Sequence, residues 1–529
     1  MRRVYALISV LFVATTLLAQ SPQKDNDAVA QLRKFNQFYS YLNGAYVEEV
    51  DMSVLVEKAI VEMLSELDPH SAYINAEDMK SVNESFEGEF SGIGVEFNIL
   101  KDTVIVVNTI VGAPAESVGV MPNDRIVAVD GEDIIGISQN QVPSYLRGKR
   151  GSKVAIEVVR HGELNTLNFV IERDNIPINT VDAAYMLNDS TGYIKINRFG
   201  HTTFSEFTDA FRSMPQPNTL VVDLRGNGGG LLNQAIDLAN FFLPKGSLIV
   251  STEGRAQSDF RMSANRNGEF TKGNVVILID EDSASASEIV AGAIQDWDRG
   301  VILGRPSFGK GLVQRQFELH DGSTARITVA RYHTPTGRVI QRPYTDGDSK
   351  GYYERHFARY GNADSLSRDT IDRPQYKTLR LGRTVYGGGG ITPDVIVESD
   401  TTRIWPYYVT LIRQNVVNEF VINYLDKHRE KLIALYPTFE QYNKNFVITE
   451  SMLAELMSLG QERGVDIEEY KIEDFSDIAQ VNLKALFAQK LFSTGEFYKV
   501  VNDNNKTIFK ELDKLLTDWD KYNQDIFGQ

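Results

Sequence analysis

The sequence predicts a multidomain protein of mixed α+β and α/β structure, with helical regions at both ends and two β-containing domains between them. Its 529 residues are enough for about three to four domains, and 42% of them are hydrophobic, which is ample for buried cores. Apolar residues recur at helical spacing near both ends of the chain. Strand-like alternation fills residues 87–172, and strands alternate with helices from about residue 175.

Residues 1–19 have the features of an export signal. Two arginines precede a nearly apolar stretch from Val4 to Leu18, and small residues surround Ala19. The stretch is short for a membrane-spanning helix, and no later segment offers about 20 uninterrupted apolar residues. We therefore expect cleavage after Ala19, an exported and periplasmic protein, and no integral membrane span in its mature form. An uncleaved membrane anchor is the alternative interpretation.

The chain between residues 28 and 174 is predicted to divide into a helical region and a β-rich domain. The helical region covers residues 28–85, where apolar residues follow a helical period and are expected to pack in a core: Leu32, Phe35, Phe38, Tyr39, Leu42, Val56, Ala59, Ile60 and Met63. The β-rich domain covers residues 86–174 and contains the alternating stretches 104–107 and 154–159. We assign no chemistry to the helical region.

From residue 175 the chain is predicted to form an α/β domain and then a helical domain. Residues 175–400 alternate between strands and helices, which indicates a mixed sheet with crossover helices; the strands are 192–196, 219–223 and 274–280, and the helices 204–214, 231–242 and 286–297. An insertion at residues 343–389, rich in Tyr, Arg and Asp, is typical of a lid or a mobile excursion. Amphipathic patterns fill residues 401–529.

The composition excludes several classes of function. A net charge of −16 at pH 7 argues against a nucleic-acid-binding protein. The chain has no cysteine, so it has no disulfide, no thiol nucleophile and no cysteine-ligated metal. Its seven histidines lack the paired spacing that is typical of zinc sites, so we expect no catalytic metal and no cofactor.

Ser285 lies at a predicted strand-to-helix turn. The apolar run 275–279 precedes it, and a helical pattern that includes Ile289 follows it. Such a turn directs free N–H groups and the positive end of a helix toward whatever the hydroxyl attacks, as acyl transfer requires. Serine is also a preferred helix N-cap, so capping by Ser285 with Glu288 is the alternative interpretation.

Lys310 follows this helix and stands between two glycines. A desolvated lysine loses affinity for its proton by up to about 3 to 5 pKa units, so a buried Lys310 can act as a general base near neutral pH. The alternative interpretation is that Lys310 is an ordinary solvated loop residue. Gln314 alone would be interpreted as a solvent-exposed surface residue. Each of these residues is weak evidence without the others.

The order Ser285, Lys310, Gln314 resembles the C-terminal processing peptidases, also called tail-specific proteases. The resemblance covers roughly residues 35–400, and five further segments carry it in family order: 67–73, 88–95, 223–230, 332–338 and 390–395. It implies that residues 175–400 form a serine protease domain, with Ser285 as nucleophile, Lys310 as general base and Gln314 orienting the lysine. This Ser-Lys variant of triad logic requires no histidine or aspartate.

The resemblance also implies an oxyanion hole made of backbone N–H groups. Ala286, next to the nucleophile, is one donor, and Gly229 in the glycine-rich run 226–230 is assigned as the other. A backbone without a Cβ can approach a substrate carbonyl closely. Which glycine donates is left open by the sequence, and the alternative is that the run only makes a tight turn between a strand and a helix.

Residues 86–174 resemble a PDZ domain, which binds an extended peptide tail by strand addition and holds its terminal carboxylate in a loop of N–H groups. The matching loop contains Gly92, Ile93, Gly94 and Val95, although an ordinary β-bend would fit the same residues. Apolar residues beside the loop would favour substrates with apolar C-terminal tails.

The resemblance therefore implies an exported serine endopeptidase whose partners are protein or peptide substrates, with homo-oligomers formed through its helical regions. The main rival is a catalytically inert PDZ scaffold that binds peptides in the cell envelope. A Ser-His-Asp protease is a weaker rival, because the chain contains no G-x-S-G-G segment.

Overall fold

The computed structural model describes residues 23–527, except 111, 161, 358–372, 398–405 and 466–474. The predicted export signal at residues 1–19 therefore lies outside the described residues, as does the middle of the insertion. The chain divides into two compact units, Met1–Leu67 and Asp68–Gln529. In the described parts, no helix combines the length and the apolar character that are needed to cross a bilayer.

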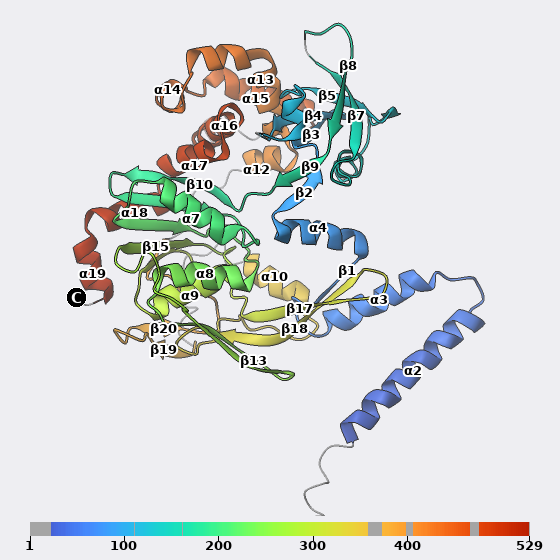
Figure 1. Ribbon diagram of the computed structural model, residues 1–529, viewed down its shortest axis with the longest axis vertical. Coiled ribbons are helices and arrows are strands. Elements are labelled where there is room, and N and C mark those ends of the chain that lie inside the picture. The colour runs from blue at the N-terminus through green and yellow to red at the C-terminus, as the bar shows by residue number, and fades with distance from the viewer. Residues whose placement is uncertain are drawn as a thin grey trace, which may run out of the picture. The chain divides into compact units, whose positions relative to one another are not determined.

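The first unit contains two helices, α2 (Gln23–Ala45) and α3 (Met52–Ser65) (Figure 1). The carboxylate of Asp51 caps α3 by accepting the N–H groups of Ser53 and Val54. Many apolar side chains of the two helices are exposed, including Val29, Leu32, Phe35, Phe38, Tyr39, Tyr41, Val54, Val61 and Met63. The core-packing role expected for Leu32 and Phe35 is therefore wrong, because their side chains are 60% and 44% exposed.

The β-rich domain is built around one antiparallel sheet and begins the second unit together with α4 (Ala76–Glu87) and β1 (Ala72–Ile74). The sheet contains β3 (Val95–Leu100), β4 (Thr103–Thr109), β5 (Arg125–Val129), β7 (Lys153–Val159) and β8 (Leu167–Glu172), with β6 (Glu132–Asp133) beside β5. Two short helices, α5 (Pro114–Ser117) and α6 (Val142–Leu146), pack on its core. Where the chain enters and leaves the domain, β2 (Glu89–Gly92) pairs with β9 (Asp174–Pro177).

The α/β domain has a six-stranded sheet with helices on both faces. Its strands, in spatial order, are β10 (Val181–Asn188), β11 (Thr191–Ile196), β12 (Thr219–Asp223), β15 (Asn274–Ile279), β16 (Val301–Gly304) and β21 (Val395–Ile396). Only the β10–β11 pair is antiparallel. Helices α7 (Thr203–Ser213), α8 (Leu232–Phe242) and α9 (Ala286–Asp296) share one core with the sheet, and α18 (Ile508–Thr517) covers its other face. This confirms the predicted mixed sheet with crossover helices.

A second, antiparallel sheet supports the loops of the site. It contains β1, β18 (Thr324–His333), β13 (Leu248–Gly254) and β14 (Gln257–Ser263), and β17 (Leu312–Glu318) pairs with β18. The described part of the insertion forms α10 (Ser349–Phe357) and the hairpin of β19 (Gln375–Lys377) and β20 (Thr384–Tyr386).

The predicted C-terminal helical domain is confirmed, and it contacts both preceding domains. It contains α12 (Pro406–Arg413), α13 (Val416–Leu435), α14 (Phe439–Asn445), α15 (Glu450–Glu462), α16 (Ser476–Leu491), α17 (Thr494–Asp503), α18 and α19 (Trp519–Phe527). On α13, Asp426 pairs with Arg125 of the β-rich domain at 2.8 Å. On α17, the hydroxyl of Tyr498 donates to Asp182 of the α/β domain at 2.9 Å.

Candidate active site

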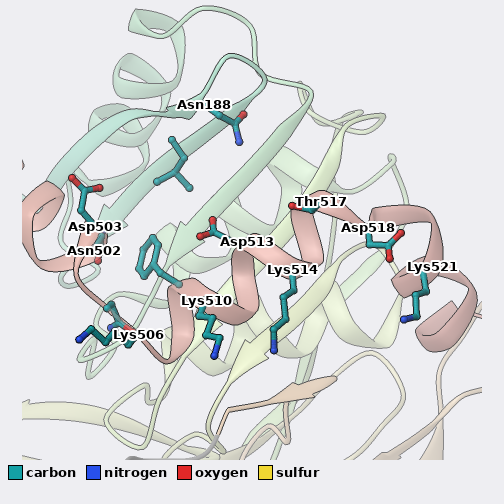
Figure 2. A pocket seen from close by; sticks show the side chains of 13 residues that line it. Asn188, Asn502, Asp503, Lys506, Lys510, Asp513, Lys514, Thr517, Asp518 and Lys521 are labelled. Atoms are coloured by element: carbon teal, nitrogen blue, oxygen red, sulfur yellow. The ribbon is translucent and has the colours of Figure 1, made fainter.

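A cavity beside the C-terminal helices has a nearly balanced charge. Figure 2 shows this cavity of about 1090 Å³ beside α18 and α19. Its wall carries four lysines and three aspartates: Lys506, Lys510, Lys514, Lys521, Asp503, Asp513 and Asp518. Because these charges nearly cancel, the wall favours no class of charged ligand.

A second cavity, of about 710 Å³, brings the sequence-predicted catalytic residues together. Ser285, Lys310 and Gln314 all line it, and so do Ala286 and the glycine segment 228–230. These residues come from α9, from the loop before β17, from β17 itself and from the loop after β12. Among the residues that the structure describes, no group of three or more His, Asp or Glu side chains is placed to share a metal ion.

Ser285 is held in a strained backbone conformation at the start of α9. Its φ of 54° lies in the left-handed region, which costs a non-glycine residue about 1–3 kcal/mol. The side chains of Ser283 and Ser287 are fully buried, and their hydroxyls donate to the carbonyls of Leu224 and Asn227, both at 2.9 Å. Ser285, in contrast, is partly exposed to the cavity. Ser285 also forms the capping box with Glu288 that the sequence allowed, and it is the serine of this cluster that lines the cavity.

The glycine segment packs directly against Ser285. A Cβ added to Gly229 would lie 2.8 Å from the Cβ of Ser285 and 2.7 Å from the carbonyl oxygen of Ala284, so only glycine fits there. The N–H of Gly229 already donates to Asn227 Oδ1 at 2.9 Å. The N–H of Ala286, in contrast, has no acceptor within the described parts of the chain. Ala286 thus has a free donor beside Ser285, whereas the donor of Gly229 is engaged.

Lys310 is partly buried and is expected to lose its proton more readily than a lysine in water. Burial lowers its pKa to about 8, and the positive charge of Arg326 acts in the same direction. The charges of Glu288 and Asp68 oppose this shift. In the described parts of the chain, no carboxylate lies within ion-pair distance of Lys310 Nζ. A substantial fraction of the amine is therefore neutral near pH 8.

The fully buried carboxylate of Glu288 links the main chain of Ser285 to that of Lys310. Its Oε2 accepts the backbone N–H groups of Ser285 at 2.8 Å and of Lys310 at 2.9 Å. Its Oε1 accepts the hydroxyl of Ser307 at 2.5 Å and the N–H of Gly309 at 2.7 Å. Burial raises the pKa of Glu288, while these four donors stabilise the charged form and oppose that shift. The sequence suggested only helix capping for this residue.

Gln314 is connected to a buried aspartate through Thr328. A β-bulge between Val313 and Gln314 sets the direction of the side chain, whose Nε2 donates to Thr328 Oγ1 at 3.3 Å and to the carbonyl of Leu312 at 3.4 Å. Thr328 Oγ1 in turn donates to Asp68 Oδ1 at 3.1 Å. In the described parts, no hydrogen bond joins Gln314 to Lys310. Sequence reasoning missed Thr328 and Asp68, although Asp68 lies in the segment 67–73 that carried the resemblance.

The loop of the β-rich domain lies at the start of an edge strand. Gly94 has a φ of 78°, which favours glycine, and the buried Ile93 accepts the N–H of Ala115 at 2.8 Å. Within the described residues, β3 pairs only with β4, so its other edge has no strand partner. Val95 and Phe97 pack against the core of the domain. This geometry is suited to the addition of a peptide strand.

Comparison with known proteins gives consistent similarities along the chain. Residues 190–350 match the model of peptidase family S41, residues 91–171 match a PDZ domain, residues 5–78 match the N-terminal domain of the activating protease CtpB, and residues 407–493 match a family of unknown function.

Individual relatives agree with these matches. The chain is 36% identical to the carboxy-terminal processing protease CtpA of Bacillus subtilis, over 64% of this chain and 73% of the relative. It is 37% identical to a carboxy-terminal-processing protease of Bartonella bacilliformis, over 64% and 80%. Among solved structures, the photosystem II D1 C-terminal processing protease is similar at 31% identity with a TM-score of 0.34, over 58% of this chain and 83% of that one.

Proposed function

Since the chain belongs to the carboxy-terminal processing proteases of peptidase family S41, we propose that it hydrolyses peptide bonds through an acyl-enzyme formed on Ser285. The observation that carries this assignment is the shared cavity, which is lined both by Ser285 and by a lysine whose pKa is lowered to about 8. An inert scaffold would have no need for a strained serine or a desolvated lysine at this place.

The proposed mechanism uses Lys310 first as a base and then as an acid. Neutral Lys310 takes the proton of Ser285 Oγ as this oxygen attacks the scissile carbonyl carbon. The resulting ammonium gives the proton to the leaving amine, and water then attacks the acyl-enzyme with Lys310 as base again. The N–H of Ala286 stabilises the oxyanion together with a donor of the segment 228–230. Gly229 can serve as that donor only if its hydrogen bond to Asn227 is released.

We assign to Gln314 the role of orienting the lysine. Thr328 donates its hydroxyl proton to Asp68, so its oxygen is left to accept the amide N–H of Gln314. The second amide hydrogen points to the carbonyl of Leu312. This leaves Gln314 Oε1 as the group available to accept a hydrogen bond from Lys310.

Replacing Thr328 by valine should free the side chain of Gln314, which would then no longer orient Lys310. Thr328→Val keeps the shape of the side chain but removes the acceptor for Gln314, and we expect kcat to fall about tenfold with little change in KM. Thr328→Ser keeps the hydroxyl and is the matched control, with kcat close to that of the wild type. Steady-state kinetics on one peptide, with thermal melting as a check on folding, measure both. Equal losses of kcat in the two variants would contradict the role of the hydroxyl.

We further propose that the PDZ domain selects substrates by an apolar C-terminal tail bound at the edge of β3 and the loop of Gly92, Ile93, Gly94 and Val95. An unfolded test protein that ends in an apolar residue with a free carboxylate should be cleaved with a kcat/KM at least about tenfold higher than the same protein with an amidated terminus. Initial rates at low substrate concentration measure this difference. Equal rates for both forms would show that cleavage does not depend on the tail.

Two proposals concern the N-terminal part of the chain. The sequence features of residues 1–19 support export to the periplasm with cleavage after Ala19, which N-terminal sequencing of the mature protein tests. The exposed apolar side chains of α2 and α3 support a homo-oligomer formed through these helices. Light scattering should show a mass above that of one chain, and polar substitutions at Leu32 and Phe38 should reduce it.

A further inference from the structure

The active-site cavity is lined with positive charge, although the chain as a whole is acidic. Its wall includes Arg198, Lys310, Arg315 and Arg326 but only one acidic residue, Glu87. The whole chain has a net charge of −16. A cleft that carries the opposite sign to the rest of the protein attracts ligands of the complementary charge, here anionic ones.

Among the cationic side chains that line the cavity, Arg326 has a buried nitrogen that lacks a hydrogen-bond acceptor among the described residues. Its Nε is buried without an acceptor, and no ion pair of Arg326 is found in the described parts of the chain. Gln316 lies directly opposite Arg326 in the β17–β18 ladder, and Gln314 lies opposite Thr328, two residues further along β18. Because residues two apart share a face of a strand, Arg326 projects from the same face as the Gln314–Thr328 pair. The guanidinium therefore lies on the catalytic side of the sheet.

Arg198 is a second guanidinium with only neutral partners. Its Nη1 donates to Ser85 Oγ at 2.8 Å and its Nε to Asn197 Oδ1 at 3.1 Å. The next residue, Phe199, pairs with Gly230 of the glycine segment. Arg198 is thus placed beside the oxyanion region and retains an unneutralised charge. Arg315 also lines the cavity, but it is exposed and lies opposite Ile327 in the ladder, so its side chain does not alternate onto the face of the Gln314–Thr328 pair.

Resting on the proposed peptidase function, we propose that the cavity selects polypeptides with an aspartate or glutamate side chain close to the scissile bond, and that Arg326 is the main specificity-determining residue. The planar guanidinium binds a carboxylate through two parallel N–H···O bonds, which satisfies the orphaned Nε. Arg198 provides additional attraction from beside the glycine segment. The apolar tail bound by the PDZ domain and the acidic residue near the cleavage site are then two separate requirements.

The test uses peptide pairs that share an apolar C-terminal tail and differ by a single Glu-to-Gln change next to the cleavage site. Cleavage sites are first mapped by mass spectrometry on an unfolded test protein. Wild-type enzyme should cleave the Glu peptide with a kcat/KM about tenfold or more above that of the Gln peptide. The assays are run well above pH 8, because loss of the Arg326 charge also raises the pKa of Lys310.

Substitutions of the arginines test which of them causes the preference for the Glu peptide. Arg326→Gln should remove the preference for the Glu peptide, because it slows cleavage of that peptide alone. Arg326→Lys keeps the positive charge but not the planar guanidinium, so it should retain part of the preference. Arg331→Gln is the matched control, because Arg331 is an exposed arginine on the same strand that does not line the cavity. It should leave the ratio of the two rates unchanged. If Arg326→Gln melts at a lower temperature, Arg326→Lys and Arg198→Gln provide the test in its place.

Each alternative outcome is distinct. Equal cleavage of both peptides by the wild type, or a preference that persists in Arg326→Gln, would overturn the proposal. A preference that disappears when the peptides are amidated would assign the recognised carboxylate to the chain terminus and would also overturn it. Failure of the wild type to cleave either peptide would instead count against the proposed peptidase function.

Discussion

Ser285→Ala is expected to abolish peptide hydrolysis and to leave the fold intact. Ser285 lines the cavity, whereas the hydroxyls of Ser283 and Ser287 are buried and bonded to carbonyl groups, so we expect neither neighbour to take its place. Removing the nucleophile of a serine protease lowers kcat by about 10⁴- to 10⁶-fold. Turnover of an unfolded test protein with an apolar tail measures the loss, and thermal melting checks the fold.

Ser283→Ala is the matched control for this prediction. It removes a hydroxyl two residues away and leaves the carbonyl of Leu224 without that donor, which should cost about 1–3 kcal/mol of stability. The control is therefore expected to melt at a lower temperature but to keep its activity under conditions in which it is folded. Activity that survives in Ser285→Ala would refute the assignment of the nucleophile.

The second large effect concerns pH and Lys310. A general base must be neutral, and the pKa of Lys310 is lowered to about 8, so kcat/KM should rise with pH and level off above about pH 8. At pH 7 only about a tenth of the lysine would be neutral. Lys310→Ala should remove activity at every pH, because it deletes the proposed general base. Rates measured from about pH 6 to pH 10 give the profile.

Asp68→Asn is a control for which the direction of the shift in the pH profile is predicted. The negative charge of Asp68 raises the pKa of Lys310, so neutralising it should move the rising limb of the profile to lower pH. A profile that is flat between pH 7 and pH 9 would contradict the role of Lys310 as the base. A limb that moves to higher pH in Asp68→Asn would contradict the electrostatic explanation.

The sequence predicted the parts of the fold that have a local signature. The expected strands 219–223 and 274–280 match β12 and β15, and the expected helix 286–297 matches α9 within a residue. Apolar periodicity carries this information because each element has one buried face. The exposed apolar side chains of α2 show the limit of the method, since periodicity does not say what covers a helix face.

The site was predictable only in its separate pieces. Ser285 and Lys310 are singled out as candidates by the joint resemblance of several segments to a family, because each segment alone also fits a helix cap or an ordinary loop. The connection of Thr328 to Asp68 joins residues 260 positions apart, and the role of Glu288 depends on a loop some 20 residues away. Contacts of this kind depend on how sheets and loops assemble. The periodicity of apolar residues within a short segment does not predict them.

The carboxylate of Glu288 has a consequence for how such an enzyme can change over evolution or be redesigned. Because it binds the main chain of Ser285 and Lys310, the spacing of the two residues is independent of the side chains that line the cavity. We therefore expect the proposed pair of Ser285 and Lys310 to keep its geometry when other residues of the cavity change. Walls that contain Arg326 or Arg198 can then be replaced to suit new substrates while the chemistry is inherited unchanged.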